Sequence, residues 1–175
     1  MRNSFILNSM TTDFTVNGTI INVLRNSAIP IYIRSPPEFM PLKPSHLKCE
    51  GYWNSIGSKN AYLPIISTKI WIDKELFVRC VYAINRYLID NGKYFRYRGL
   101  SPSRIISNEY VGAGEYEDTE YNMCWPENYI GHYIRDHNVM PTRRFYEYVA
   151  MRINTLPPEY KWDIYALDIR NEVSI

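Results

Sequence analysis

Five residues have the chemistry needed to bind a metal ion. His46 and Cys49 form an H-x2-C pair, and Cys124, His132 and His137 follow much later in the chain. Zinc is bound by cysteine thiolates and histidine nitrogens in a tetrahedral array, and two pairs from separate segments often supply them. The later residues are spaced more widely than in the usual zinc motifs. We therefore expect no bound metal, with a zinc site of His46, Cys49, Cys124 and His132 as an alternative.

The sequence lacks the motifs of common catalytic sites. It contains no G-x-S-x-G, no P-loop and no G-x-G-x-x-G. Its one glycine-rich loop, Gly112-Ala113-Gly114, precedes acidic residues, which have the wrong charge for cradling a phosphate. We expect a protein that is not an enzyme and needs no cofactor. A hydrolase that uses His132 or His137 is the remotest alternative.

A basic aromatic segment and an acidic aromatic segment follow one another in the middle of the chain. Residues 93–104 read KYFRYRGLSPSR, and residues 109–127 read EYVGAGEYEDTEYNMCWPE. Basic side chains neutralise phosphates and aromatic rings stack on bases, so the first segment suits single-stranded nucleic acid. The residues of this alternative are Lys93, Tyr94, Arg96, Tyr97 and Arg98. The acidic run 115–120 is expected to be a solvated loop.

Two helices are predicted to flank these segments. Apolar residues recur at helical spacing from Leu76 to Leu88, which indicates a helix over about 74–91 that ends at Asn91-Gly92. A second helix over 142–155 begins after Pro141 and ends before Pro157-Pro158. The stretch between the helices is predicted to be a long irregular aromatic loop.

The first 72 residues read as a β-rich part. Asn17-Gly18 lies between two β-branched runs, which is a strong hairpin signal, and four prolines within 36–44 indicate an extended connector. Residues 47–53 and 62–72 are further expected strands, and 161–169 alternates like a closing strand. These features predict one α+β domain over 1–175, with a mostly antiparallel N-terminal sheet packed by the two helices. The strand count of the N-terminal part also allows a small OB-like barrel, which would serve nucleic-acid binding.

The charge of the chain is unevenly distributed along its length. Residues 1–104 hold 14 Lys/Arg and 6 Asp/Glu, a balance of +8, whereas residues 105–175 hold 6 and 12, a balance of −6. Either the two parts fold together and neutralise each other, or a basic surface meets an acidic one on a neighbouring molecule. An odd number of cysteines and an N-terminus without a signal-peptide pattern predict an intracellular or virion location and no membrane partner.

The aromatic content favours a structural protein that acts through protein–protein contacts. The chain has 16 Tyr, 6 Phe and 4 Trp, and Tyr, Trp and Arg are enriched at interface hot spots. Ile, Asn and Tyr have A/T-rich codons and together fill 52 of 175 positions, which suggests a viral or phage particle component. We expect a homo-oligomer or larger assembly, with nucleic acid as a possible second partner. The predicted interface residues are Tyr94, Tyr97, Arg98, Tyr116, Tyr121 and Trp125.

Overall fold

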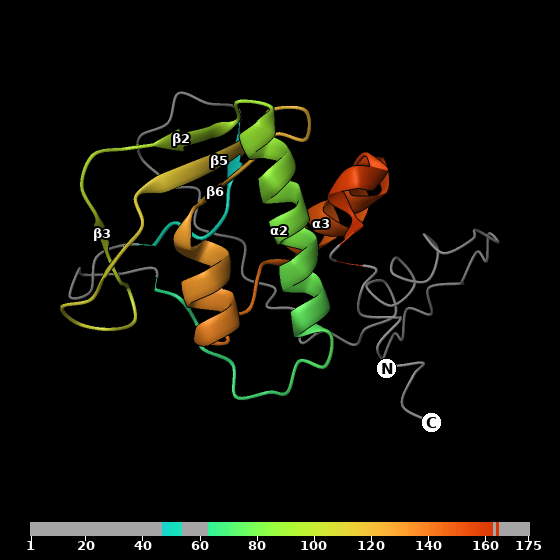
Figure 1. Cartoon of the computed structure of the whole chain (residues 1–175). Coiled ribbons are helices and arrows are strands. Elements are labelled where there is room, and N and C mark those ends of the chain that lie inside the picture. Colours follow the sequence, from blue (N-terminus) through green and yellow to red (C-terminus); the bar gives the residue numbers. More distant parts are fainter. Residues whose placement is uncertain (1–46, 54–62, 163, 165–175) are drawn as a thin grey trace, which may run out of the picture.

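The computed structural model describes residues 47–53, 63–162 and 164, and the elements of this part are shown in Figure 1. They follow in the order β1 (Lys48–Cys49), α2 (Lys74–Asp90), β2 (Tyr94–Arg96), β3 (Ser101–Pro102), β4 (Tyr110–Val111), β5 (Gly114–Asp118), β6 (Met123–Pro126), the π-helix η1 (Tyr129–Asp136), α3 (Arg143–Thr155) and the 3-10 helix η2 (Pro158–Tyr160). The result is an α+β fold, which confirms the predicted class. Among the described residues, no helix has the length and apolar character that crossing a membrane requires.

Helix α2 confirms the first predicted helix. Its buried side chains include Phe77, Val81, Ile84 and Leu88, which recur every three or four residues and form one apolar stripe. The helix stops where the sequence indicated, because Gly92 adopts a positive φ of 67° that L-residues with side chains disfavour.

Helix α3 confirms the second predicted helix and begins with a side-chain cap. The Oγ1 atom of Thr142 accepts a hydrogen bond of 3.2 Å from the backbone N–H of Phe145, which satisfies a donor of the first turn. Phe145, Val149 and Ile153 form its buried face. These residues repeat at helical spacing, so the pattern alone was enough to place the helix.

The stretch between the two helices forms a sheet, and the prediction of a long irregular loop is wrong there. Strands β2, β5 and β6 come from this stretch and join β1 in a four-stranded sheet with the order β1-β6-β5-β2. Antiparallel pairing sets Tyr116 opposite Trp125, and β3 and β4 form a separate two-stranded ribbon. The acidic residues of β5 are typical of a solvated loop, whereas Glu115 and Asp118 are buried in the fold.

The other predicted strands are mostly wrong or lie outside the described residues. The predicted strand 47–53 is reduced to the two residues of β1, which pairs in parallel with β6. Within 63–72 the pairing found with other described residues is a bridge from Ile66 to Val139, and Trp162 and Ile164 are helical rather than extended. Ile70 and Ile72 are 89% and 88% exposed, so their β-branched side chains have no packed sheet face to occupy. The predictions for residues 1–46 and 165–175 fall outside the described residues.

One aromatic-rich core joins the sheet to the helices. The sheet face that carries Trp125 packs against α2 and α3, because the Trp125 Nε1–H donates to Asn85 on α2 over 3.1 Å and its ring contacts Phe145 on α3. Tyr129 from η1 lies against Phe145 from the other side. Figure 1 shows α2 and α3 side by side, next to the sheet. The opposite face of the sheet carries Phe95, Glu115 and Cys124, which alternate with the core residues along the strands.

Candidate interaction surface

The outer edge of the sheet at β2 leaves main-chain groups without a strand partner among the described residues. The N–H of Glu117 donates to the carbonyl of Lys93, and the N–H of Tyr97 donates to the carbonyl of Ala113. In an antiparallel pair successive residues alternate between bonding the neighbour and facing away. The N–H and C=O groups of Tyr94 and Arg96 therefore point away from β5. We name the outer edge of Tyr94–Arg96, with the side chains that follow it to Leu100, the β2 edge.

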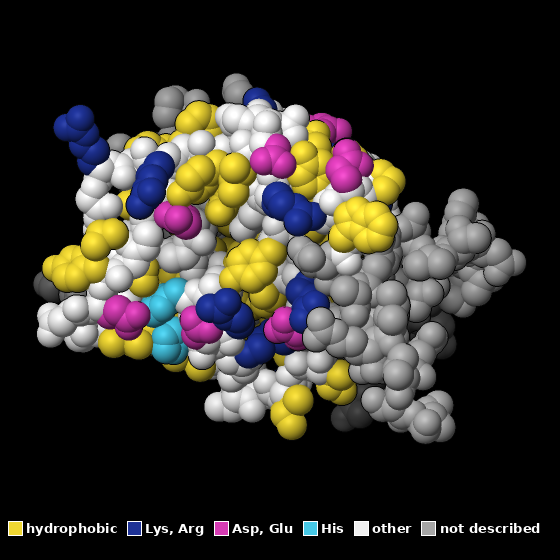
Figure 2. Space-filling model, viewed as in Figure 1, with side chains coloured by type: hydrophobic (Ala, Val, Ile, Leu, Met, Phe, Trp, Pro, Cys, Tyr) yellow, Lys and Arg dark blue, Asp and Glu magenta, His cyan; other side chains and the backbone are white. Residues whose placement is uncertain are grey.

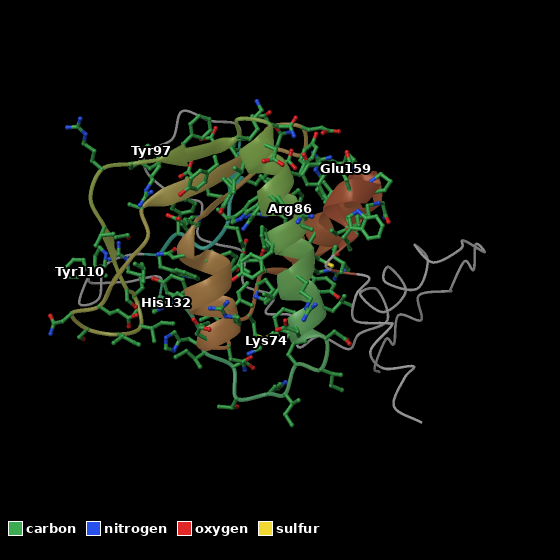
Figure 3. The ribbon with its side chains drawn as sticks, viewed as in Figure 1. Lys74, Arg86, Tyr97, Tyr110, His132 and Glu159 are labelled. Atoms are coloured by element: carbon green, nitrogen blue, oxygen red, sulfur yellow. The ribbon has the colours of Figure 1, made fainter. Side chains whose placement is uncertain are left out.

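Exposed aromatic and basic side chains accompany the outward-facing main-chain groups of the β2 edge. Phe95, Tyr97 and Leu100 are 41%, 52% and 64% exposed. Arg96 and Arg98 are also exposed, and neither forms an ion pair among the described residues. Figure 3 places Tyr97 beside β2. The β2 edge thus combines strand-pairing groups, apolar area and positive charge.

The acidic segment is turned into the protein and does not form a solvated loop. Asp118 is 2% exposed and pairs with the Arg152 Nε over 2.9 Å, and it also accepts a hydrogen bond of 2.9 Å from the Tyr148 hydroxyl. Arg152 contacts Glu120 over 3.1 Å, and its guanidinium lies 4.8 Å from the ring centres of both Tyr87 and Tyr121. Burial raises the pKa of Tyr148, and the neighbouring Asp118 carboxylate adds to that shift. This part of the acidic run therefore holds α3 to the sheet.

The other buried carboxylates have similarly internal partners. The Tyr52 hydroxyl donates to Glu115 on the sheet face opposite the helices, and burial raises the pKa of Tyr52. Glu50 follows β1 and accepts hydrogen bonds from the Tyr129 hydroxyl over 2.7 Å and from the Thr142 N–H over 2.9 Å. Burial raises the pKa of Glu50, and the bonds from Thr142 oppose that shift. These contacts are structural, because each carboxylate bonds to groups of a different element.

The predicted interface residues divide between the surface and the core. Tyr97 and Arg98 are exposed on the β2 edge, as an interface requires. Trp125 and Tyr116 are 0% and 7% exposed, so they belong to the core and not to the surface where an interface is expected. Tyr121 is half-buried, since its ring lies over Arg152 and its hydroxyl donates to Thr155. Tyr94, also half-buried, packs against Tyr116 at a ring distance of 4.9 Å. The sequence could not separate these tyrosines, because core and surface tyrosines share one segment.

The structure divides the predicted zinc residues. Cys49 and Cys124 lie in register on β1 and β6, with their Sγ atoms 2.7 Å apart. His132 lies elsewhere, on η1, and His46 falls outside the described residues. The described residues contain no group of three metal-binding side chains. The predicted set therefore yields a cysteine pair, without a third ligand among the described residues.

His132 belongs to an array that sequence reasoning missed. Its Nε2 lies 2.8 Å from the Ser103 Oγ, and its Nδ1 lies 3.6 Å from the Glu109 Oε1. The His137 ring packs edge-to-face against it at a ring distance of 4.7 Å, and Figure 2 shows the two histidines together. Burial lowers the pKa of His132, although Glu109 opposes that shift. The order serine–histidine–carboxylate is that of a hydrolytic triad.

The environment of Ser103 favours a structural role for this array. Ser103 is 3% exposed, and its Oγ also accepts hydrogen bonds from the N–H groups of Ile105 and Ile106 at 3.2 and 3.0 Å. A hydroxyl has two acceptor lone pairs and one hydrogen. Both lone pairs are engaged by the loop, so the hydrogen is available to His132. The array therefore fastens the loop between β3 and β4 to η1, and no residue spacing in the sequence would have revealed it.

Comparisons with known proteins add nothing to this geometry, since no protein-family model, curated protein or solved structure matches the chain.

Proposed function

We propose that this is a non-enzymatic assembly protein that binds an extended acidic segment of a protein partner along the β2 edge. The observation that carries the proposal is the position of β2 at the end of the sheet, with exposed cations and aromatic rings beside its outward main-chain groups. An extended peptide would add to the sheet as a fifth strand. Peptide recognition by strand addition draws its affinity from main-chain hydrogen bonds and its specificity from alternate side chains.

The main chain argues for a peptide rather than a nucleic acid. The N–H and C=O groups of Tyr94 and Arg96 form donor–acceptor pairs at strand spacing, which an extended polypeptide matches group for group. Unpaired strand edges are the surfaces on which other chains pair. Leu100 is 64% exposed and adds apolar area to this edge.

The charges argue for an acidic partner. Arg96 and Arg98 are exposed and lack ion pairs among the described residues, while the buried acids Glu115 and Asp118 are engaged internally. Unpaired surface cations favour a partner of the opposite charge and speed its encounter with the protein. Two copies of β2 pairing edge to edge would bring the arginines of both strands together, so direct β2–β2 pairing is disfavoured. The viral or phage setting and the intracellular or virion location stay part of this proposal.

A designed peptide tests the proposal directly. The probe is a fluorescent peptide of about ten residues that alternates Glu and Val, so that one face is acidic and the other apolar. Anisotropy titrations at low salt compare wild-type protein with Arg96→Pro and Arg98→Glu. Proline at 96 removes an outward N–H and no bond to β5, so the fold is retained. We expect each variant to bind at least about tenfold more weakly, a change of about 1.4 kcal/mol.

Matched controls separate the β2 edge from general charge effects. Lys69 is exposed and lies on the segment bridged to Val139, so Lys69→Glu changes the net charge as Arg98→Glu does and should leave binding unchanged. Thermal unfolding of each variant checks that the fold is intact. The proposal fails if wild-type protein does not bind the peptide, if all variants bind equally, or if a single-stranded oligonucleotide of equal charge binds more tightly. The last result would favour the nucleic-acid alternative.

Light scattering identifies the source of the acidic segment. A mass that rises with protein concentration in the wild type and stays monomeric in Arg96→Pro would show that a second copy of this chain supplies it, which supports the proposal. A rise that persists in both Arg96→Pro and Arg98→Glu would place self-association elsewhere and count against the β2 edge.

A further inference from the structure

Two cysteines that are 75 positions apart in sequence face each other across the β1–β6 pair. Cys49 and Cys124 are register partners, and their Sγ atoms lie 2.7 Å apart. A disulfide bond is about 2.05 Å long and bridges residues whose Cα atoms lie about 4.4–6.8 Å apart. Neighbouring strands in a sheet are about 4.8 Å apart, within that range. The backbone therefore already holds the two thiols where a bond between them can form.

The two thiols differ in their access to solvent. Cys49 is partly exposed, whereas Cys124 is completely buried on the sheet face that it shares with Glu117, near Tyr52. Cys80 is the third cysteine and lies in the core on α2, where burial raises the pKa of its thiol to about 12. An oxidant arriving from solvent thus reaches Cys49 first, and Cys124 is the only cysteine beside it in the described part of the chain.

We propose that Cys49 and Cys124 form a reversible disulfide when the protein meets a hydroperoxide. The Cys49 thiolate attacks one oxygen of hydrogen peroxide, which breaks the O–O bond and leaves a sulfenic acid on Cys49 and hydroxide in solution. The Cys124 sulfur then attacks the Cys49 Sγ, the S–S bond forms, and the sulfenic oxygen leaves as water with the Cys124 proton. Overall, two thiols are oxidised and one peroxide is reduced to two waters. A dithiol reductant reverses the reaction.

The bond would strengthen a weak connection in the fold. β1 has only two residues, and its backbone is held to β6 by hydrogen bonds such as Lys48 N–H to Asn122 over 2.7 Å and Glu50 N–H to Cys124 over 2.8 Å. A covalent link here fixes residues 47–53 to the sheet and closes a long loop, which restricts the unfolded chain. The inference does not depend on the β2 edge, so either proposal can fail without the other.

Thiol counting and peptide mapping on the full-length protein test the proposal. The reduced chain has three cysteines, so reagent-accessible thiols in denaturant should fall from three to one after hydrogen peroxide treatment. Intact mass should fall by about 2 Da, and dithiothreitol should restore both values. A tryptic digest of the oxidised protein should contain a cross-linked peptide pair that joins Cys49 to Cys124.

Serine substitutions provide the controls. Cys80→Ser should form the bond as the wild type does, while Cys49→Ser and Cys124→Ser should not, and in Cys124→Ser the Cys49 sulfenic acid should be trapped by dimedone. The oxidised wild type should also unfold at a higher temperature than the reduced form. The proposal is overturned if the digest shows Cys49 linked to Cys80 or to another molecule, or if Cys49 in the wild type proceeds to sulfinic acid without a cross-link.

Discussion

Arg152 gives the sharpest test of the conclusion that the acidic segment is structural. Its side chain is 4% exposed, and its Nε contacts the buried Asp118 over 2.9 Å. Its guanidinium also lies over the rings of Tyr87 and Tyr121, each at 4.8 Å. The variant Arg152→Met keeps an apolar stem of similar length and removes the charge. Asp118 then keeps its hydrogen bond from Tyr148 but loses the buried cation that pairs with it.

The expected loss is a large part of the stability of a domain. Leaving one partner of a buried ion pair uncompensated costs about 3–5 kcal/mol. Each cation–π contact contributes about 0.5–1 kcal/mol or more once desolvated. Arg152→Met should therefore lower the free energy of unfolding by about 4–7 kcal/mol, compared with a typical total of about 5–15 kcal/mol. The contact of Arg152 with Glu120 adds little, because the Glu120 side chain is 63% exposed.

A double-mutant cycle in urea measures this interaction. Asp118→Asn removes the buried negative charge and still accepts the Tyr148 hydroxyl, so the double variant should be more stable than Arg152→Met alone by about 2 kcal/mol or more. The exposed pair of Arg143 and Glu147 on the same helix is the control, and Arg143→Met should cost less than about 1 kcal/mol. A loss for Arg152→Met as small as that of the control, or a coupling energy near zero, would refute the structural assignment of the acidic segment.

Two further predictions concern residues whose sequence-based roles changed. Trp125→Ala should lower the free energy of unfolding by about 3–5 kcal/mol, whereas Tyr97→Ala should change it by less than about 0.5 kcal/mol, and equal losses in urea unfolding would contradict the division into core and surface. Because the folded pKa of His132 lies below its ordinary value of 6.5, the unfolded chain binds more protons just below pH 6.5, so the free energy of unfolding should fall as pH drops from there toward the folded pKa. His132→Gln should reduce this pH dependence of the free energy of unfolding. If the array is structural, a fluorophosphonate should not label Ser103 in the wild type, and labelling that disappears in Ser103→Ala would instead favour a hydrolase.

The helices could be predicted from the sequence because their cause is local. Phe77, Val81 and Ile84 repeat on one face, and Asn91-Gly92 supplies an end signal within a few residues. A periodic stripe and a stop signal need no information about the rest of the chain. The predicted bounds of both helices accordingly agree with α2 and α3 to within a residue or two.

The sheet could not be predicted in the same way because its partners are distant. The sequence of β5, GEYED, suggests a solvated loop. Its burial depends on distant partners, because Glu115 bonds Tyr52, 63 positions away, and Asp118 pairs with Arg152, 34 positions away. The contact between Cys49 and Cys124 was partly anticipated, because the alternative zinc site placed both cysteines around one metal ion. Residue type alone indicated that the two could share a site, and only the register of β1 with β6 shows that they do.

The charge asymmetry of the chain takes on a different meaning once the strands are paired. The sequence allowed either mutual neutralisation or a basic surface that meets an acidic one on a neighbour. Basic β2 lies beside acidic β5, and the buried acids Glu115 and Asp118 have partners inside the fold, so their charge is not displayed to a second molecule. Arg96 and Arg98 are exposed and form no ion pair within the described part of the chain. Because Glu115 and Asp118 are buried with internal partners while these arginines are exposed, the β2 edge is suited to an acidic segment from elsewhere rather than to the acidic strand next to it.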